Sequence, residues 1–196
     1  KASRSVNLAP ATVNRELALL RHMFTMAIQW GKAESNPVKE VKLFRESSGR
    51  TRYLADDEEL RLFAVLPEKY QAVVALALQT GLRMGELKNL RWWDVDFKAG
   101  VITVLEAKAG ETQHVPMNVI ARKILESLSQ KDTLVFPDLP RHLSERFTEL
   151  ARKAEVRDFT FHDLRHTFCS RLVMAGVDIR TVQVLARHKE IRMTLR

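Results

Sequence analysis

Apolar side chains recur at helical spacing near the start of this sequence. Pro10 suits the first turn of a helix, and Gly31 suits the position just past a helix end. Between them, apolar residues repeat every three or four positions, the period of one helical face: Leu17, Leu20, Phe24, Ala27 and Ile28. The pattern predicts a helix over 10–30, followed by a turn at Asn36-Pro37.

A longer unit of mixed helical and strand patterns begins near residue 56. The acidic run 56–59 suits a helix N-terminus, and the apolar run Tyr70–Thr80 predicts a buried helix that Gly81 ends. The β-branched segment 101–104 and the segment 113–116 predict a hairpin. Further helices are predicted over 118–130, 141–155, 162–175 and 178–187. The expected fold class is therefore mainly α with a small antiparallel β-sheet, an α+β fold.

A polar, glycine-containing stretch separates these two parts. Residues 42–52 include Ser47-Ser48-Gly49, a composition typical of interdomain linkers. The helical part before it is too short to bury a core of its own. We therefore expect residues 1–45 to be the C-terminal part of a helical domain, residues 46–55 to be a linker, and residues 56–196 to be a second domain.

Positive charge is concentrated at the two ends of the chain. The net charge is +8, with +5 in residues 1–50, +5 in residues 151–196 and a small negative balance between them. Such a distribution favours a polyanion as partner, nucleic acid above all. No apolar run approaches the roughly 20 residues of a membrane span, and the single Cys169 forms neither an intrachain disulfide nor a zinc site. We expect a cytoplasmic protein without membrane contact.

The predicted helix 162–175 carries an arginine beside its apolar face. Its positions divide into a core face of Phe161, Leu164, Phe168, Leu172 and Ala175, a flanking strip of His162, Arg165 and Cys169, and an opposite, solvated side of Asp163, Thr167 and Ser170. A buried, unpaired charge costs several kcal/mol, so Arg165 needs an anionic partner. An internal carboxylate and a bound phosphate both remain open.

Three further cations or histidines are candidates. Arg83 follows Gly81 at a turn where free backbone N–H groups gather, and Glu86 could orient it; a surface arginine on a capping turn is the alternative. Lys108 lies at the hairpin tip, where most lysines are simply solvated. His188 lies near the end of the last predicted helix, among basic neighbours.

The order and spacing of these residues are more specific than any one of them. The sequence contains Thr80-Gly81-Leu82-Arg83-x-Gly85-Glu86-Leu87, then Leu90-Arg91-Trp92-x-Asp94-Val95-Asp96, then the lysine-tipped hairpin ending in Val115-Pro116, then His162-Asp163-Leu164-Arg165-His166-Thr167 and a later His188. From about residue 10 to the end, this pattern resembles the tyrosine recombinases, the phage integrase family. The segment from Thr12-x-Asn14-Arg15 to Asn36-Pro37 resembles the end of that family's SAM-like core-binding domain.

The resemblance implies a DNA breaking-rejoining catalytic fold that cuts and rejoins DNA through a 3′-phosphotyrosine, without metal, ATP or another cofactor. It implies double-stranded DNA with a specific recombination site as partner, a homotetramer on that DNA, and a phage or mobile-element origin. The implied roles are a phosphate clamp for Arg83 and Arg165, proton donation to the leaving 5′-oxygen for Lys108, assistance at the nucleophile for His162, a phosphate contact for His188, support from Glu86 and His166, and DNA contacts in the N-terminal part for Arg4, Asn14, Arg15 and Arg21.

The sequence departs from the family pattern in two places. The family's nucleophilic tyrosine would stand at position 197, directly after Arg196, and neither Tyr53 nor Tyr70 matches it. We therefore expect the chain as printed to bind DNA without cleaving it. Ala186-Arg187 also replaces the usual Leu-Gly before His188, which leaves the backbone geometry at this histidine open.

Three alternatives remain at this stage. A type IB topoisomerase shares the chemistry but relaxes supercoils, and a non-catalytic DNA-binding or regulatory relative would keep the fold alone. A metal-dependent hydrolase using His162, Asp163 and His166 is the weakest, because further carboxylate ligands at suitable spacing are missing.

Overall fold

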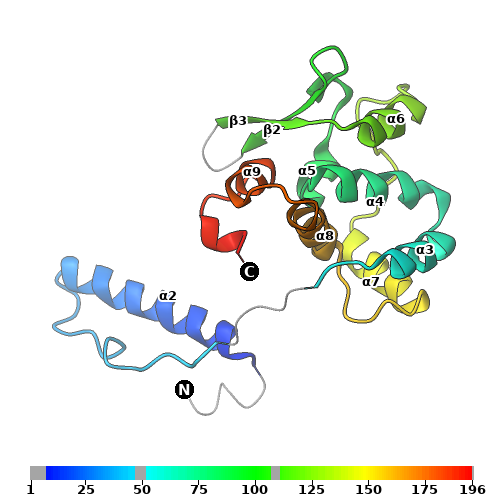
Figure 1. Ribbon diagram of the computed structural model, residues 1–196. Helices are drawn as coiled ribbons and strands as arrows, with labels where there is room; N and C mark the ends of the chain where they lie inside the picture. The colour runs from blue at the N-terminus through cyan, green and yellow to red at the C-terminus, as the bar shows by residue number, and fades with distance from the viewer. Residues whose placement is uncertain (1–7, 47–51, 107–110, 196) are drawn as a thin grey trace. The chain divides into compact units, whose positions relative to one another are not determined.

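One long helix, α2 (Pro10–Gln29), organises the first part of the chain. The computed structural model describes residues 8–46, 52–106 and 111–195, and it divides the chain into two units, 1–50 and 51–196 (Figure 1). Gly31 adopts φ +65° directly after α2, as the predicted helix stop requires. The chain then turns back and runs beside the helix, so residues 8–46 of this unit form α2 and a returning segment.

The second unit combines helices with one small sheet. Its helices are α3 (Asp56–Val65), α4 (Glu68–Thr80), α5 (Met84–Asn89), α6 (Val119–Ser127), α7 (Leu143–Lys153), α8 (Phe161–Met174) and α9 (Ile179–Leu185), with 3-10 turns η1 (Trp92–Asp94) and η2 (Ile191–Met193). The strands β1 (Val95–Asp96), β2 (Val101–Glu106) and β3 (Glu111–Pro116) form an antiparallel sheet in the order β1-β2-β3. In the β2–β3 hairpin, Val101 pairs with Pro116 and Ile102 with Val115. The predicted α+β fold class is confirmed.

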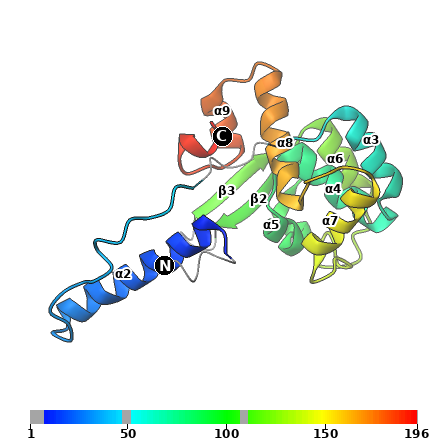
Figure 2. The ribbon, with the colours of Figure 1, turned by 90° about the horizontal axis from the view of Figure 1, so that it is seen from below.

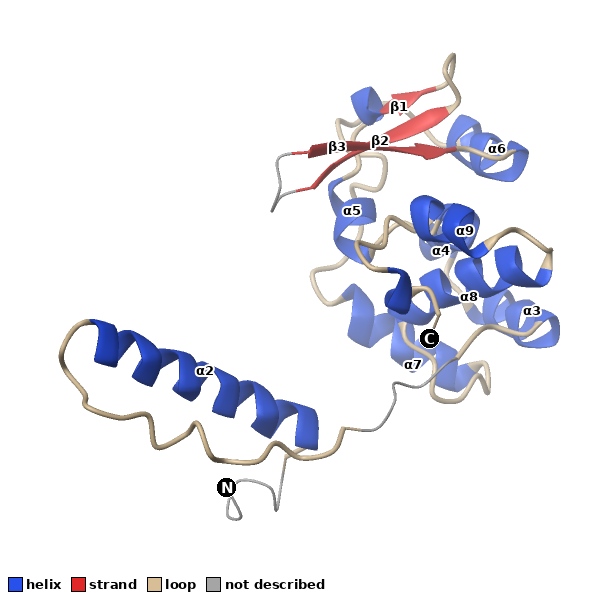
Figure 3. Ribbon diagram, turned by 60° about the vertical axis from the view of Figure 1, so that its left-hand side comes forward, coloured by secondary structure: helices blue, strands red, loops and turns tan. Residues whose placement is uncertain are grey.

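The core of this unit is built around α4. Val73, Leu76 and Ala77 are at most 1% exposed, as expected for a helix that is apolar on most sides. Helix α4 packs against α8 on one side and α6 on another, and the sheet lies beside α6 (Figures 2 and 3). This arrangement brings the C-terminal end of α4 against the middle of α8, although the two helices are far apart in sequence.

The side of α8 that we expected to be solvated is buried. Asp163 is 6% exposed and Thr167 is fully buried. The hydroxyl of Thr167 accepts a hydrogen bond from the backbone N–H of Leu54 at 2.9 Å. The expectation was wrong because the segment entering the unit returns across this face, a long-range contact that helical periodicity does not reveal. Ala175, expected in the core, is exposed at the helix end.

Part of the segment that we expected to be a linker, residues 46–55, packs against the second unit. Arg52 makes a two-pronged ion pair with Glu58, and Leu54 is 1% exposed. Residues 52–55 are thus packed onto the second unit. None of the helices in the described ranges is long and apolar enough to cross a membrane.

Candidate phosphate-binding site

The site begins at the tight turn that ends α4. Gly81 lies in the left-handed region at φ +62°, and a Cβ atom there would come within 2.5 Å of the Phe168 ring on α8. Its carbonyl oxygen accepts a hydrogen bond of 2.6 Å from Nη1 of Arg165. Glycine at this position therefore permits α8 to approach closely and places the Arg165 guanidinium at the end of α4.

Arg165 is buried, and one of its two terminal nitrogens makes no hydrogen bond to the residues that the structure describes. The residue is 3% exposed, and within the described part of the chain its Nη2 has no hydrogen-bond partner. Burial, together with the nearby charges of Arg83 and Arg187, lowers the pKa of Arg165 to about 10. Among the described residues no carboxylate is hydrogen-bonded to Arg165, so the internal ion pair that the sequence left open is not formed. A bound anion would satisfy this group.

Arg83 is held at the start of α5 by Glu86. The carboxylate of Glu86 accepts the backbone N–H of Arg83 at 2.7 Å and its Nη1 at 2.9 Å, while Nη2 of Arg83 donates to the carbonyl of Arg187 at 3.3 Å. Burial alone would raise the pKa of Glu86, but the charge of Arg187 and the hydrogen bonds from Arg83 outweigh it and lower that pKa. Glu86 thus stays ionised and orients Arg83.

Three histidines surround the two arginines. The rings of His162 and His166 meet edge to face with centroids 5.0 Å apart, and Nδ1 of His188 lies 2.9 Å from the Thr194 hydroxyl. Partial burial and the charges of Arg165 and Arg83 lower the pKa of His188 to about 4. The same causes, with His166, lower the pKa of His162, although its ring still reaches solvent. Both rings are therefore neutral at pH 7.

A small pocket opens between these groups. Its volume is 130 Å³, and it is lined by Leu82, Arg83, Met84, Ser144, Phe161, His162 and Arg165. The structure therefore brings together Arg83, Glu86, His162, Arg165, His166 and His188 as expected. The two guanidinium groups and the imidazole of His162 around this pocket can hold a tetrahedral anion and exchange protons with it.

The remaining predicted residues are Lys108 and the four N-terminal residues expected to contact DNA. Lys108 and Arg4 are outside the described residues. Asn14 is buried, and its amide bonds both backbone groups of Phe44, while Arg21 donates to the carbonyl of Val41. The hydrogen bonds of Asn14 and Arg21 in the structure are internal and hold the returning segment to α2; the DNA-contact role expected for these residues stays a prediction. Arg15 is exposed.

The residues of the metal alternative do not converge. Asp163 accepts hydrogen bonds from the backbone N–H and hydroxyl of Thr160, at 2.7 and 2.8 Å, and so caps α8. Within the described ranges, no three side chains of His, Cys, Asp or Glu are grouped as metal ligands would be.

Two residues of the site were not predicted from the sequence. Ser144, from the start of α7, lines the pocket, and no motif or periodicity singles it out. Arg187 was noted only as a departure from the family pattern, yet its buried side chain binds Glu86 at 2.8 Å.

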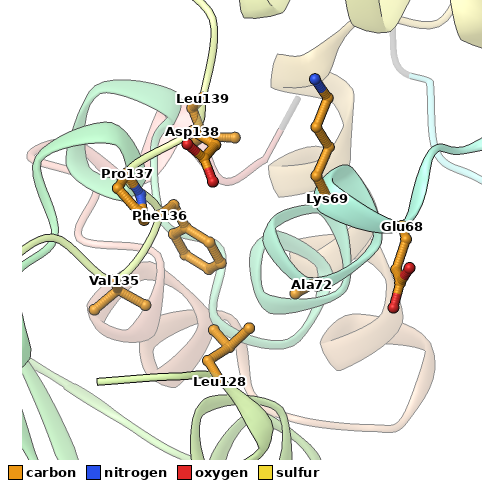
Figure 4. A pocket seen from close by; sticks show the side chains of 9 residues that line it. All are labelled: Glu68, Lys69, Ala72, Leu128, Val135, Phe136, Pro137, Asp138 and Leu139. Atoms are coloured by element: carbon orange, nitrogen blue, oxygen red, sulfur yellow. The ribbon is translucent and has the colours of Figure 1, made fainter. Parts of the chain in front are cut away.

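A larger hollow of 340 Å³ lies near the N-terminal end of α4 (Figure 4). Its lining combines apolar side chains, among them Ala72, Leu128 and Phe136, with the charged Lys69 and Asp138. It contains none of the predicted site residues, so its size does not make it the functional site.

Comparisons with known proteins agree with the motif pattern. A model of the phage integrase family matches residues 52–196. A shufflon-specific DNA recombinase of Escherichia coli is 33% identical over 191 residues, covering 94% of this chain and 50% of that protein. The tyrosine recombinase XerC of Oceanobacillus iheyensis is 29% identical, covering 95% and 69%. The chain thus spans half to about two thirds of the length of these relatives.

Solved structures show the same fold. A lambda integrase dimer bound to a COC′ core site matches with a TM-score of 0.77 and 25% identity, over 94% of this chain and 74% of that one. The Tn1549 transposon integrase in complex with a circular intermediate DNA matches with a TM-score of 0.78 and 22% identity, over 98% and 76%. The second likeness, at that identity, concerns the fold alone.

Proposed function

Because this chain belongs to the phage integrase family, we propose that it is the catalytic part of a site-specific DNA recombinase. The observation that carries the proposal is the buried Arg165, which lines the same pocket as Arg83 and whose Nη2 has no hydrogen-bond partner among the described residues. A charge in this state requires an anion, and the scissile phosphate of DNA supplies one.

The two arginines would act on the phosphate itself. When a tyrosine oxygen attacks phosphorus in line with the 5′-oxygen, negative charge grows on the non-bridging oxygens. Arg165 is fixed by Gly81, and Arg83 is fixed by Glu86. Guanidinium groups held in advance bind that charge without reorganising during the reaction, which lowers the barrier.

The histidines would handle protons and hydrogen bonds. Since His162 is neutral at pH 7, it can accept the proton that the attacking tyrosine loses. His188, also neutral, would donate one ring N–H to a phosphate oxygen while its Nδ1 stays with Thr194. Lys108, which the sequence places between β2 and β3, would protonate the leaving 5′-oxygen. The P–O5′ bond breaks as the phosphotyrosine bond forms, so the step reverses with another DNA end.

The partner would be double-stranded DNA carrying a specific site. Lambda integrase has been solved as a dimer on a core site and as a tetramer on a Holliday junction. We extend this assembly to the present chain as a homotetramer on DNA, with Arg15 among the backbone contacts. Integrases of phages P22 and P2 are among the relatives, which supports a mobile-element origin and action in the cytoplasm.

A covalent-adduct assay tests this function. A recognition site is first selected from random-sequence DNA by binding to the chain, and is then prepared with a nick beside the scissile phosphate. The chain extended by a tyrosine at position 197 should form an adduct that survives denaturing electrophoresis. The chain extended by phenylalanine is the matched control and should form none. If the tyrosine-extended chain binds DNA tightly but forms no adduct, the protein is a non-catalytic DNA-binding relative.

A further inference from the structure

Arg187 occupies a backbone position that suits glycine. It follows α9 with φ +52°, and the turn is closed by bonds from the Arg187 N–H to Val184 O, at 2.9 Å, and from the His188 N–H to Gln183 O, at 3.0 Å. This is the Schellman end of a helix, in which the left-handed residue is usually glycine. An arginine here strains the backbone, so its side chain must offset that cost through its contacts.

Those contacts lead to Glu86. The Arg187 side chain is 4% exposed, and its Nη2 donates to Oε2 of Glu86 at 2.8 Å. The other carboxylate oxygen, Oε1, accepts Nη1 of Arg83 at 2.9 Å. One partly buried carboxylate therefore joins two guanidinium groups whose residues are 104 positions apart in the sequence.

The backbone of Arg187 closes a cycle of hydrogen bonds among Arg83, Glu86 and Arg187. Its carbonyl oxygen accepts Nη2 of Arg83 at 3.3 Å. Both terminal nitrogens of Arg83 are thus anchored, Nη1 directly by Glu86 and Nη2 by Arg187. The left-handed backbone of Arg187 matters here, because it aims the carbonyl while the side chain folds back to Glu86.

We propose that Arg187 is a positioning residue that fixes the Arg83 guanidinium at the phosphate pocket, through Glu86 and through its own carbonyl. The proposal rests on the proposed recombinase function and adds a residue to it. Arg187 does not line the pocket, so it acts on the geometry of Arg83 rather than by touching DNA. Its effect belongs to the cleavage step, because misplacing a charge by about 1 Å costs on the order of 100-fold in rate.

Cleavage kinetics give the first test. In the chain extended by tyrosine, Arg187→Met and Arg187→Gly should slow single-turnover adduct formation by roughly 10- to 100-fold, with DNA affinity nearly unchanged. Arg187→Lys keeps a donor for Glu86 and should recover most of the rate. Arg180→Met, which removes an exposed arginine from the preceding helix, α9, controls for loss of charge. Arg187→Gly suits the left-handed backbone, so it remains informative if Arg187→Met does not fold.

Side-chain NMR gives a second test that does not depend on cleavage. In the 196-residue chain, the Nη signals of Arg83, assigned by comparison with Arg83→Lys, should report a guanidinium with hindered rotation. Arg187→Met and Arg187→Gly should release that rotation, whereas Arg180→Met should not. If Arg187→Met and Arg187→Gly leave the Arg83 signals unchanged, the positioning role is wrong. It is also wrong if rotation of the Arg83 guanidinium is released but the cleavage rate does not change. If the unaltered extended chain forms no adduct, the recombinase function fails, and the Arg83 signals alone decide the role of Arg187.

Discussion

At the scale of single residues, Gly81 connects the turn that carries Arg83 to the helix that carries Arg165. Its φ of +62° ends α4, the missing Cβ leaves room for the ring of Phe168, and its carbonyl holds Arg165. Another residue could adopt this positive φ at some cost in free energy, but its Cβ atom would clash with the ring of Phe168.

Gly81→Ala should therefore lower the free energy of unfolding by about 2–4 kcal/mol, from left-handed strain and from the clash with Phe168. Gly100→Ala is the matched control, because Gly100 has φ +70° but nothing within 4 Å of an added Cβ. It should cost only about 1 kcal/mol. Urea unfolding of both variants measures the difference, and equal losses would mean that the contact with Phe168 carries no weight.

The histidines make the site sensitive to pH. The pKa of His188 is lowered from 6.5 to about 4 by burial and by the arginines, so the folded state favours the neutral ring. The contribution of His188 to the free energy of unfolding is therefore fully present above pH 6.5, and it is lost as the pH falls toward 4. His188→Gln should accordingly flatten the loss of unfolding free energy over that range.

An NMR titration checks the cause of the shift. The midpoint of His188 should lie near 4 in the free chain and should rise when inorganic phosphate is added, because the anion offsets Arg83 and Arg165. At constant pH, phosphate should leave the ring signals of His22, on α2, in place. A His188 midpoint near 6.5 that does not change when phosphate is added would show that the nearby arginine charges do not lower the pKa of His188.

At the scale of elements, α8 is fastened to the start of its unit. The Thr167 hydroxyl accepts the Leu54 N–H and donates to the Asp163 carbonyl at 2.8 Å. Thr167→Val should cost about 1–3 kcal/mol, because the buried Leu54 N–H loses its acceptor. Thr167→Ser retains the hydroxyl and should cost much less. Equal unfolding free energies for the two variants would show that the hydrogen bond contributes little.

Local signals explain which elements the sequence predicts well. The apolar run of α4 and its glycine stop are readable without knowing any distant contact, and so is the β2–β3 hairpin. The strand β1 has two residues, too few for a pattern to stand out. The buried back of α8 depends on Leu54, which is 113 residues away, and no helical period records such a contact.

The same distinction applies to the site. Arg83 and Glu86 are three residues apart, and His162, Arg165 and His166 share one helix, so motif spacing is enough to group them. Arg187 reaches Glu86 across 101 positions. The sequence pattern marks Arg187 only as a replacement of the usual glycine before His188, and its link to the arginine site depends on the folded structure.

At the scale of the whole molecule, charge should govern DNA affinity. A protein that neutralises about six phosphates loses on the order of 1,000-fold in affinity between roughly 50 and 200 mM salt. Arg15→Gln, at an exposed position of α2, should reduce the slope of log affinity against log salt by about 0.9. Arg146→Gln is the control, because Arg146 is paired with Glu149 on α7. A flat salt response would contradict a polyanion-binding surface.

The proposed site-specific recombination requires that the buried charge of Arg165 act on the phosphate during cleavage. The most direct measurement is the single-turnover rate of adduct formation in the tyrosine-extended chain, compared with its Arg165→Met variant, which keeps most of the side-chain volume. We predict a loss of about 100- to 1,000-fold in that rate, with DNA affinity within about threefold, as expected when one of several phosphate contacts is removed. An Arg165→Met variant that forms the adduct at the unaltered rate would contradict the phosphate clamp.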